Sequence, residues 1–174
     1  MNGLAAAPDC SYVPLHASAV AVQGGAWIFL GPGGTGKSTM LQLIGRRARP
    51  LADDKIYLVR RSQRWIVVDA GGRDFHYSLS DQETAALDGP HLQAVVQLRQ
   101  ASELSLEPLV PLDVCRGLVE AFFELPWHKQ YDVQTAQRVF STLAAVARAV
   151  PGYRLHATRS PRVYPLLDAA INIW

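Results

Sequence analysis

Short β-prone runs separated by turn residues occupy much of the first two thirds of the chain. Ser18 to Gln23 and Ala26 to Leu30 are two apolar runs joined by a pair of glycines, which suits a β-hairpin. Ile56 to Arg60 and Trp65 to Asp69 predict a second hairpin across a polar turn. Further strands are expected at Leu92 to Leu98, Glu103 to Leu106 and Tyr153 to Ala157.

Helical periodicity dominates the last third of the chain. Helices are expected over Val114 to Glu124, Val133 to Val150 and Arg162 to Ile173, and an earlier one over Ser38 to Arg47. Asp132 is a suitable N-cap for the helix that begins at Val133. The pattern predicts an α/β fold with a mixed sheet and C-terminal helices, and not a regular βαβ winding.

One internal segment follows neither pattern. Gly71 to Gly89 is polar and poorly periodic, so we expect it to be mobile, with one helical turn near Asp81 to Leu87.

Composition narrows the class of protein. The 174 residues suit a single domain over 1–174, and 49% apolar with 18% charged residues is typical of a soluble globular chain. A formal net charge of +2 gives no reason to expect a nucleic-acid partner, and no apolar stretch is long enough to span a membrane. Two cysteines far apart, Cys10 and Cys115, favour a reducing, cytoplasmic setting.

The glycine-rich segment Gly31-Pro-Gly-Gly-Thr-Gly-Lys-Ser38 matches the phosphate-loop pattern G-x-x-x-x-G-K-[ST]. Its glycines let backbone N–H groups approach phosphates, and the helix that follows directs its positive end to the same anion. A chance match in a chain of this length is on the order of 1%. The predicted nucleotide-binding residues are Gly31, Gly33, Gly34, Thr35, Gly36, Lys37, Ser38 and Thr39. Lys37 is expected to reach the β- and γ-phosphates, and the Ser38 hydroxyl to ligate Mg²⁺.

Two adjacent acids, Asp53 and Asp54, end the short strand expected after the loop's helix. A carboxylate beside a transferred phosphoryl group can orient an acceptor hydroxyl and accept its proton. In isolation the pair is more simply a solvated turn. The nearby phosphate loop favours the catalytic interpretation.

The ordered combination of Leu15-His16-Ala-Ser-Ala, the phosphate loop and Leu51-Ala-Asp-Asp54 resembles the catalytic domain of HPr kinase/phosphorylase. It is more similar still to short HPr-kinase-related proteins found beside natural-product peptide genes, including lasso-peptide serine kinases. The resemblance implies a fold like that of phosphoenolpyruvate carboxykinase around the nucleotide. It also implies transfer of the γ-phosphoryl group of ATP, or of another nucleoside triphosphate, to a serine hydroxyl.

The same resemblance assigns roles. Asp53 would be the base on the acceptor hydroxyl and Asp54 would help hold Mg²⁺, with an exchange of these roles left open. Lys37 and His16 would complete the catalytic group, His16 as a polar partner of the two acids. The alternative for His16 is a hydrogen-bonded histidine at a strand edge.

Two departures from the family pattern shape the functional prediction. The family's arginine-containing glycine-rich segment has no clear match, and its second metal-binding acid is missing, with Asp69 only a loose stand-in. We therefore expect a stand-alone kinase that phosphorylates a serine of a peptide or small protein. A nucleotide-binding subunit without turnover and a small-molecule kinase stay open as alternatives. Trp174 fits packing against the body of the protein or against a second copy in a homo-oligomer.

Overall fold

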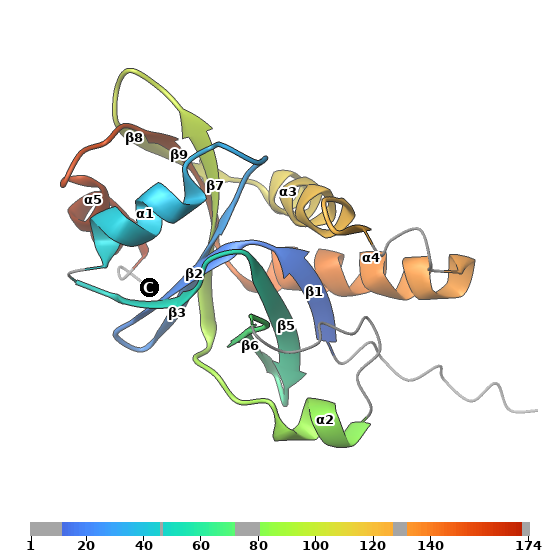
Figure 1. The fold of residues 1–174 in the computed structure, drawn as a ribbon. Coiled ribbons are helices and arrows are strands. Elements are labelled where there is room, and N and C mark those ends of the chain that lie inside the picture. Colours follow the sequence, from blue (N-terminus) through green and yellow to red (C-terminus); the bar gives the residue numbers. More distant parts are fainter. Residues whose placement is uncertain (1–11, 46, 72–80, 127–131, 172–174) are drawn as a thin grey trace, which may run out of the picture.

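The computed structural model describes residues 12–45, 47–71, 81–126 and 132–171, which form two sheets and five helices (Figure 1). The larger sheet has six strands in the order β4 (Arg49–Ala52), β2 (Ser18–Val22), β3 (Gly25–Leu30), β7 (Leu92–Gln100), β9 (Gly152–Ala157) and β8 (Ser105–Leu109). β3, β7 and β9 are parallel neighbours, whereas the outer strands pair antiparallel. The sheet is therefore mixed, as predicted.

A second, antiparallel sheet has the strand order β1 (Tyr12–His16), β5 (Lys55–Arg61) and β6 (Arg64–Asp69). The hairpin of β5 and β6 agrees with the sequence pattern, but β1 is a strand that the pattern does not predict. Its sequence Tyr-Val-Pro-Leu-His contains a proline, which weakens a strand signal. Tertiary packing compensates, since Val13, Pro14 and Leu15 are all buried.

Helices cover both faces of the larger sheet (Figure 1). α1 (Lys37–Ile44) and α5 (Val163–Ile171) lie on one face, and α3 (Pro111–Phe123) and α4 (Val133–Ala149) lie on the other. α2 (Asp81–Ala86) lies beside the small sheet and coincides with the predicted helical turn. No helix within the described ranges is both long and apolar enough to cross a membrane.

Two apolar cores lie against the two faces of the larger sheet. One core includes Ile28, Leu58 and Leu118 and joins the two sheets to α3 and α4. The other, which includes Phe29 and Ile44, joins the opposite face of the large sheet to α1 and α5. Because neighbouring residues of β3 point to opposite faces, this strand contributes to both cores.

Several predicted boundaries move by a few residues. α1 ends at Ile44 and not at Arg47, since Gly45 follows it as the C-cap. β8 begins at Ser105 and runs to Leu109, later than predicted. Asp132 does cap α4: its side chain accepts a hydrogen bond from the Thr135 backbone N–H, which lowers the pKa of the carboxyl. The capping contribution is therefore present at neutral pH and is lost as the carboxyl protonates in acid. The predicted mobility of Gly71 to Gly89 falls largely outside the described residues.

We expect Leu118→Ala to lower the free energy of unfolding by about 2–5 kcal/mol, because Leu118 is fully buried between α3 and the sheets. The matched control is Leu112→Ala on the same helix, where the side chain is 69% exposed and the change should stay within about 0.5 kcal/mol. Urea denaturation followed by circular dichroism measures both values. Equal losses in the two variants would contradict the assigned orientation of α3.

Candidate functional site

The glycine-rich loop leaves the carboxyl end of β3, the strand that lies in the middle of the larger sheet and is buried along its whole length. Gly34 and Gly36 have φ angles of +80° and +100°, which residues with a Cβ rarely adopt. Gly36 is also the N-cap of α1, and no side chain caps this helix. The first N–H groups of α1 are therefore directed at the loop, an arrangement that favours a bound anion.

The Lys37 side chain is folded back over the loop. Its ammonium donates hydrogen bonds to the carbonyl oxygens of Gly31 (2.6 Å) and Pro32 (3.4 Å), and the residue is only 7% exposed. Among the described residues no acidic side chain forms an ion pair with it. The structure thus holds a buried cation whose charge no described carboxylate balances at the base of the loop.

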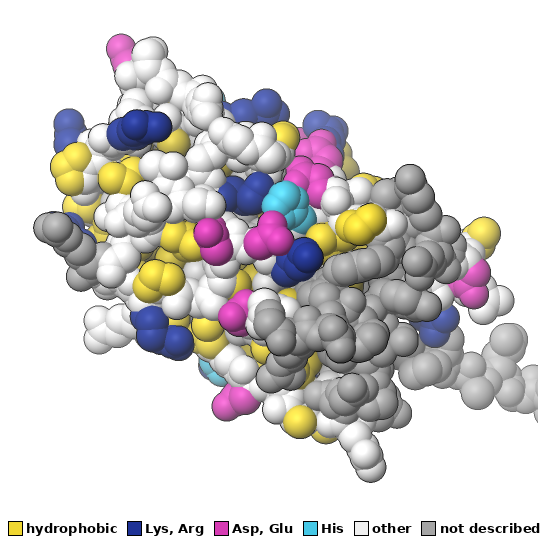
Figure 2. Space-filling model, in the orientation of Figure 1, with side chains coloured by type: hydrophobic (Ala, Val, Ile, Leu, Met, Phe, Trp, Pro, Cys, Tyr) yellow, Lys and Arg dark blue, Asp and Glu magenta, His cyan; other side chains and the backbone are white. Residues whose placement is uncertain are grey.

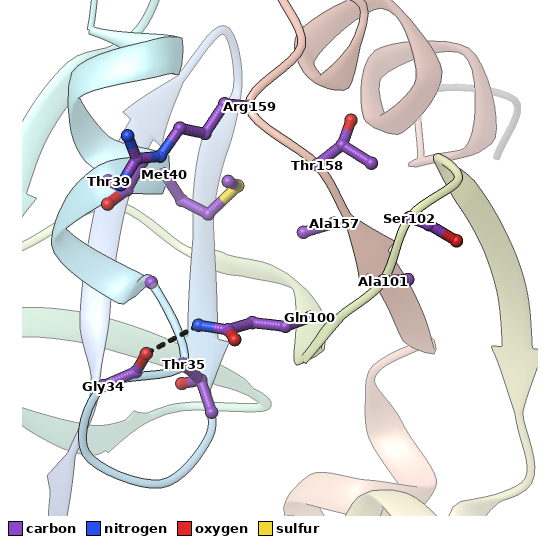
Figure 3. A pocket seen from close by; sticks show the side chains of 11 residues that line it. Gly34, Thr35, Thr39, Met40, Gln100, Ala101, Ser102, Ala157, Thr158 and Arg159 are labelled. Carbon is purple, nitrogen blue, oxygen red and sulfur yellow. Dashed lines mark hydrogen bonds between the residues drawn. The ribbon is translucent and has the colours of Figure 1, made fainter.

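A cavity of about 480 Å³ opens on one side of the loop (Figure 3). The start of α1 forms one wall, and the segments after β7 and β9 form the other. Gln100 crosses the base of the cavity and donates a hydrogen bond to the Gly34 carbonyl (2.9 Å). Arg159 extends from the segment after β9 toward Thr39 and Met40 of α1. The cavity lies where a nucleoside attached to phosphates on the loop would fit.

The two acids lie in the turn between β4 and β5, beside the start of the loop. Ser18 of β2 pairs with Phe29 of β3, which stands two positions before Gly31. The Ser18 hydroxyl donates a hydrogen bond to the Asp53 carbonyl (2.7 Å) and lies 3.3 Å from its carboxylate oxygen Oδ1. Sheet register therefore brings Asp53 to the edge from which the loop leaves.

His16 lies between two carboxylates. Its Nε2 is 3.1 Å from Oδ1 of Asp54, and its Nδ1 contacts Oε2 of Glu124 directly after α3. Lys55 Nζ is 3.9 Å from the other Asp54 oxygen. On the face shown in Figure 2, acidic side chains gather around a histidine in this way. The histidine thus ends β1 with a carboxylate facing each ring nitrogen.

A second cavity, of about 320 Å³, joins this cluster to the loop. Gly31 and Pro32 of the loop form part of its wall, and Glu120 and Glu124 face them from the α3 side. Arg99 of β7 lines it as well. The two cavities therefore border the loop at different places, one beside α1 and the other beside α3.

The structure brings most of the predicted site residues to this one edge of the large sheet. Thr35 and Thr39 line the first cavity with Gly34 and Gly36, while Ser38 is exposed at the start of α1. Gly33 is exposed in the loop, where an added Cβ would meet no atom within 4 Å. Asp69 ends β6 opposite Ile56, and its carboxylate accepts a hydrogen bond from the Gly71 backbone N–H (2.8 Å).

Sequence reasoning misses Glu124 and Gln100 of the site and points to Arg159 only by its place in the chain. Glu124 marks only a helix end in the sequence pattern, and Gln100 carries no signal because it lies outside every motif. Arg159 follows the last strand of the sheet, and its position after that strand is the one usable clue. All three reach the site from elements distant in sequence from the loop.

Comparisons with known proteins give a matching family and a similar fold. A sequence model of the family described as "SynChlorMet cassette protein ScmC" matches residues 5–172. Among solved structures, the HPr(Ser) kinase/phosphatase from Coxiella burnetii has a similar fold, with a TM-score of 0.50 and 12% identity over 90% of this chain and 89% of that one. No curated protein matches the sequence. The structural likeness and the strand order confirm the predicted α/β fold with a mixed sheet, similar to the fold of that kinase/phosphatase.

Substitution of Gly36 tests the geometry of the loop. Gly36→Ala should lower the free energy of unfolding by about 1–2 kcal/mol, because an added Cβ would make only an ordinary contact with the Thr39 side chain (3.9 Å) but φ is +100°. Gly33→Ala, in the same loop without a positive φ, should change it by less than about 0.5 kcal/mol. Thermal and urea unfolding measure both variants. A larger loss for Gly33→Ala than for Gly36→Ala would show that the loop has another conformation.

Proposed function

The chain belongs to the family of the SynChlorMet cassette protein ScmC, and we propose that it is a kinase that transfers the γ-phosphoryl group of ATP to a serine hydroxyl of a peptide or small protein. The observation that carries this proposal is the position of the acids. Asp53 lies at the sheet edge where the phosphate loop begins, Asp54 follows it, and His16 connects Asp54 to Glu124, which lines the second cavity with the first residues of the loop.

Nucleotide binding rests on the loop and the first cavity. The backbone N–H groups of Gly33 to Thr39, together with Lys37, would hold the phosphates, and the cavity beside Gln100 and Arg159 would take the nucleoside. An entering phosphate would replace the Gly31 and Pro32 carbonyl oxygens as partners of the Lys37 ammonium. A buried cation with neutral partners gains most from such an exchange.

The residues present fit a magnesium ion. Ser38 and Asp54 offer hard oxygen ligands on exposed side chains, and the Asp54 side chain is 66% exposed. Mg²⁺ commonly takes one or two protein ligands and completes its shell with phosphate oxygens and water. Within the described residues no group of three or more His, Cys, Asp or Glu forms a metal cage, which suits this mode of binding. The ion would neutralise charge on the phosphate oxygens.

The acceptor would approach through the second cavity. Its serine oxygen would attack the γ-phosphorus as the bond to the β,γ-bridging oxygen breaks, and the serine proton would pass to the Asp53 carboxylate. Arg99 and Glu124 line this cavity. The cassette named in the family description, together with the sequence resemblance to kinases of lasso-peptide clusters, favours a peptide encoded by neighbouring genes as the acceptor.

A second candidate is a nucleotide-binding subunit that does not turn over. The contacts of the two acids favour this candidate. Ser18 contacts the Asp53 carboxylate, and both His16 and Lys55 contact the Asp54 carboxylate. Such a subunit would bind ATP but leave every acceptor unmodified. Measurements of ATP affinity and of phosphate transfer separate it from the kinase.

Lys37→Ala should weaken ATP binding by about 10- to 100-fold, since a hydrogen bond to a charged group contributes ~1.5–3 kcal/mol. Isothermal titration calorimetry with ATP and Mg²⁺ measures the dissociation constant. Arg148→Ala, an exposed cation in the last turn of α4, is the control and should leave the constant unchanged. Equal affinity of Lys37→Ala and the wild type would exclude the phosphate loop as the nucleotide site.

Asp53→Asn should lower the rate of transfer by about 10²- to 10⁴-fold, the usual contribution of a general base, and leave ATP affinity within about twofold. Intact-mass spectrometry of neighbouring-gene peptides incubated with protein, ATP and Mg²⁺ would detect the added phosphate. Asp54→Asn should instead raise the Mg²⁺ concentration needed for half-maximal rate. If Asp54→Asn slows transfer and Asp53→Asn changes the Mg²⁺ requirement, the roles of base and metal ligand are exchanged. Phosphorylation of free metabolites but not of peptides would indicate a small-molecule kinase.

A further inference from the structure

Glu124 is an acidic residue at an unfavourable place in the fold. It is the C-cap of α3, where the helix dipole presents its negative end, and no basic residue occupies the last turn of this helix. A carboxylate there is normally destabilising, so the stability of α3 does not explain a glutamate at this position. The contact of its side chain with His16 does explain it.

We infer that Glu124 is a positioning residue of the phosphoryl-transfer site, which holds the His16 ring so that its opposite nitrogen faces Asp54. The inference rests on the function proposed above. His16 contacts Glu124 through Nδ1 and Asp54 through Nε2, so the ring spans two carboxylates from separate elements. Two opposed contacts fix both the position and the rotation of an imidazole ring, which a single contact does not.

Glu124 is well suited to this role because its backbone is held firmly. Leu118 and Phe122 of α3 are buried in the core, and Gly117 approaches so near to β7 that an added Cβ would lie 2.3 Å from the Gln97 side chain. The Glu124 backbone N–H donates a hydrogen bond to the Glu120 carbonyl (3.0 Å). Its side chain is only 28% exposed, compared with 66% for Asp54. Of the two carboxylates that contact His16, Glu124 is therefore the more firmly held and Asp54 the more exposed.

Loss of Glu124 would free the histidine and, through it, Asp54. Among the described residues, the remaining charged contact of Asp54 is with Lys55 at 3.9 Å, too long for a hydrogen bond. Asp54 would then sample several orientations beside the phosphate loop. Transfer should slow because the fraction of protein with a productive arrangement falls, while the nucleotide cavity beside α1 is untouched.

The main experiment compares Glu124→Ala with Glu124→Gln in the full chain. Glu124→Ala should lower kcat about 10- to 100-fold, as loss of a supporting contact commonly does, and leave KM for ATP within about twofold. Glu124→Gln keeps an oxygen that can face Nδ1 and should recover most of kcat. In a His16→Ala background, Glu124→Ala should cause no further loss, because the two residues act through one contact.

A second measurement does not depend on activity. Nitrogen NMR of the His16 ring in nucleotide-free protein should show changed Nδ1 and Nε2 signals in Glu124→Ala, and signals close to the wild type in Glu124→Gln. Glu120→Ala is the matched control, since Glu120 lines the same cavity one turn earlier on α3. It should leave the His16 signals unchanged. Thermal unfolding of each variant verifies that the fold is intact.

Two results would overturn the inference: unchanged His16 signals in Glu124→Ala, or kcat within about twofold of the wild type in that variant. If Glu124→Ala fails to fold, kcat and the His16 signals are measured in Glu124→Gln instead, and kcat also in Glu124→Gln combined with His16→Ala. These measurements then decide the inference. Absence of transfer by the wild-type protein would refute the proposed kinase function instead. In that event the ring signals alone decide whether Glu124 positions His16.

Discussion

The site depends on the complete burial of one strand. β3 lies between β2 and β7 in the larger sheet, and all six of its residues are buried, with alternate side chains in the two cores. A strand packed on both faces cannot shift by one residue without moving apolar side chains into the wrong core. The glycine loop that leaves its end is therefore held at one place, and the contacts of β2 with β3 set where Ser18 and Asp53 lie beside it.

Charge is distributed unevenly around that fixed loop. On the loop itself the Lys37 ammonium and the start of α1 create a positive site that no described carboxylate neutralises. On the α3 side, Glu120 and Glu124 line the second cavity, and the Glu124 carboxylate contacts His16, which also contacts Asp54. This separation suits a reaction in which phosphates bind at the positive part while a hydroxyl gives up its proton at the negative part. Both parts are built from elements that the cores hold in place.

Much of the fold could be predicted from local pattern. The two hairpins, the α4 cap at Asp132 and the mixed sheet all follow from periodicity and turn chemistry within short windows. β1 could not be predicted, because a proline weakens its pattern and its stability comes from pairing with β5. The separation of the strands into two sheets could not be predicted either, since no local property of β5 or β6 distinguishes them from strands of the larger sheet.

By itself, the sequence determined where the phosphate-loop motif lies, because that motif is contiguous and its glycines, lysine and serine would act through their own backbone and side chains. The tertiary structure alone decided which distant residues accompany it. Glu124 comes to His16 only because α3 packs across the sheets, and Gln100 comes to Gly34 only because β7 runs parallel to β3. Contacts of this kind depend on the packing of whole elements, and no spacing along the chain encodes them.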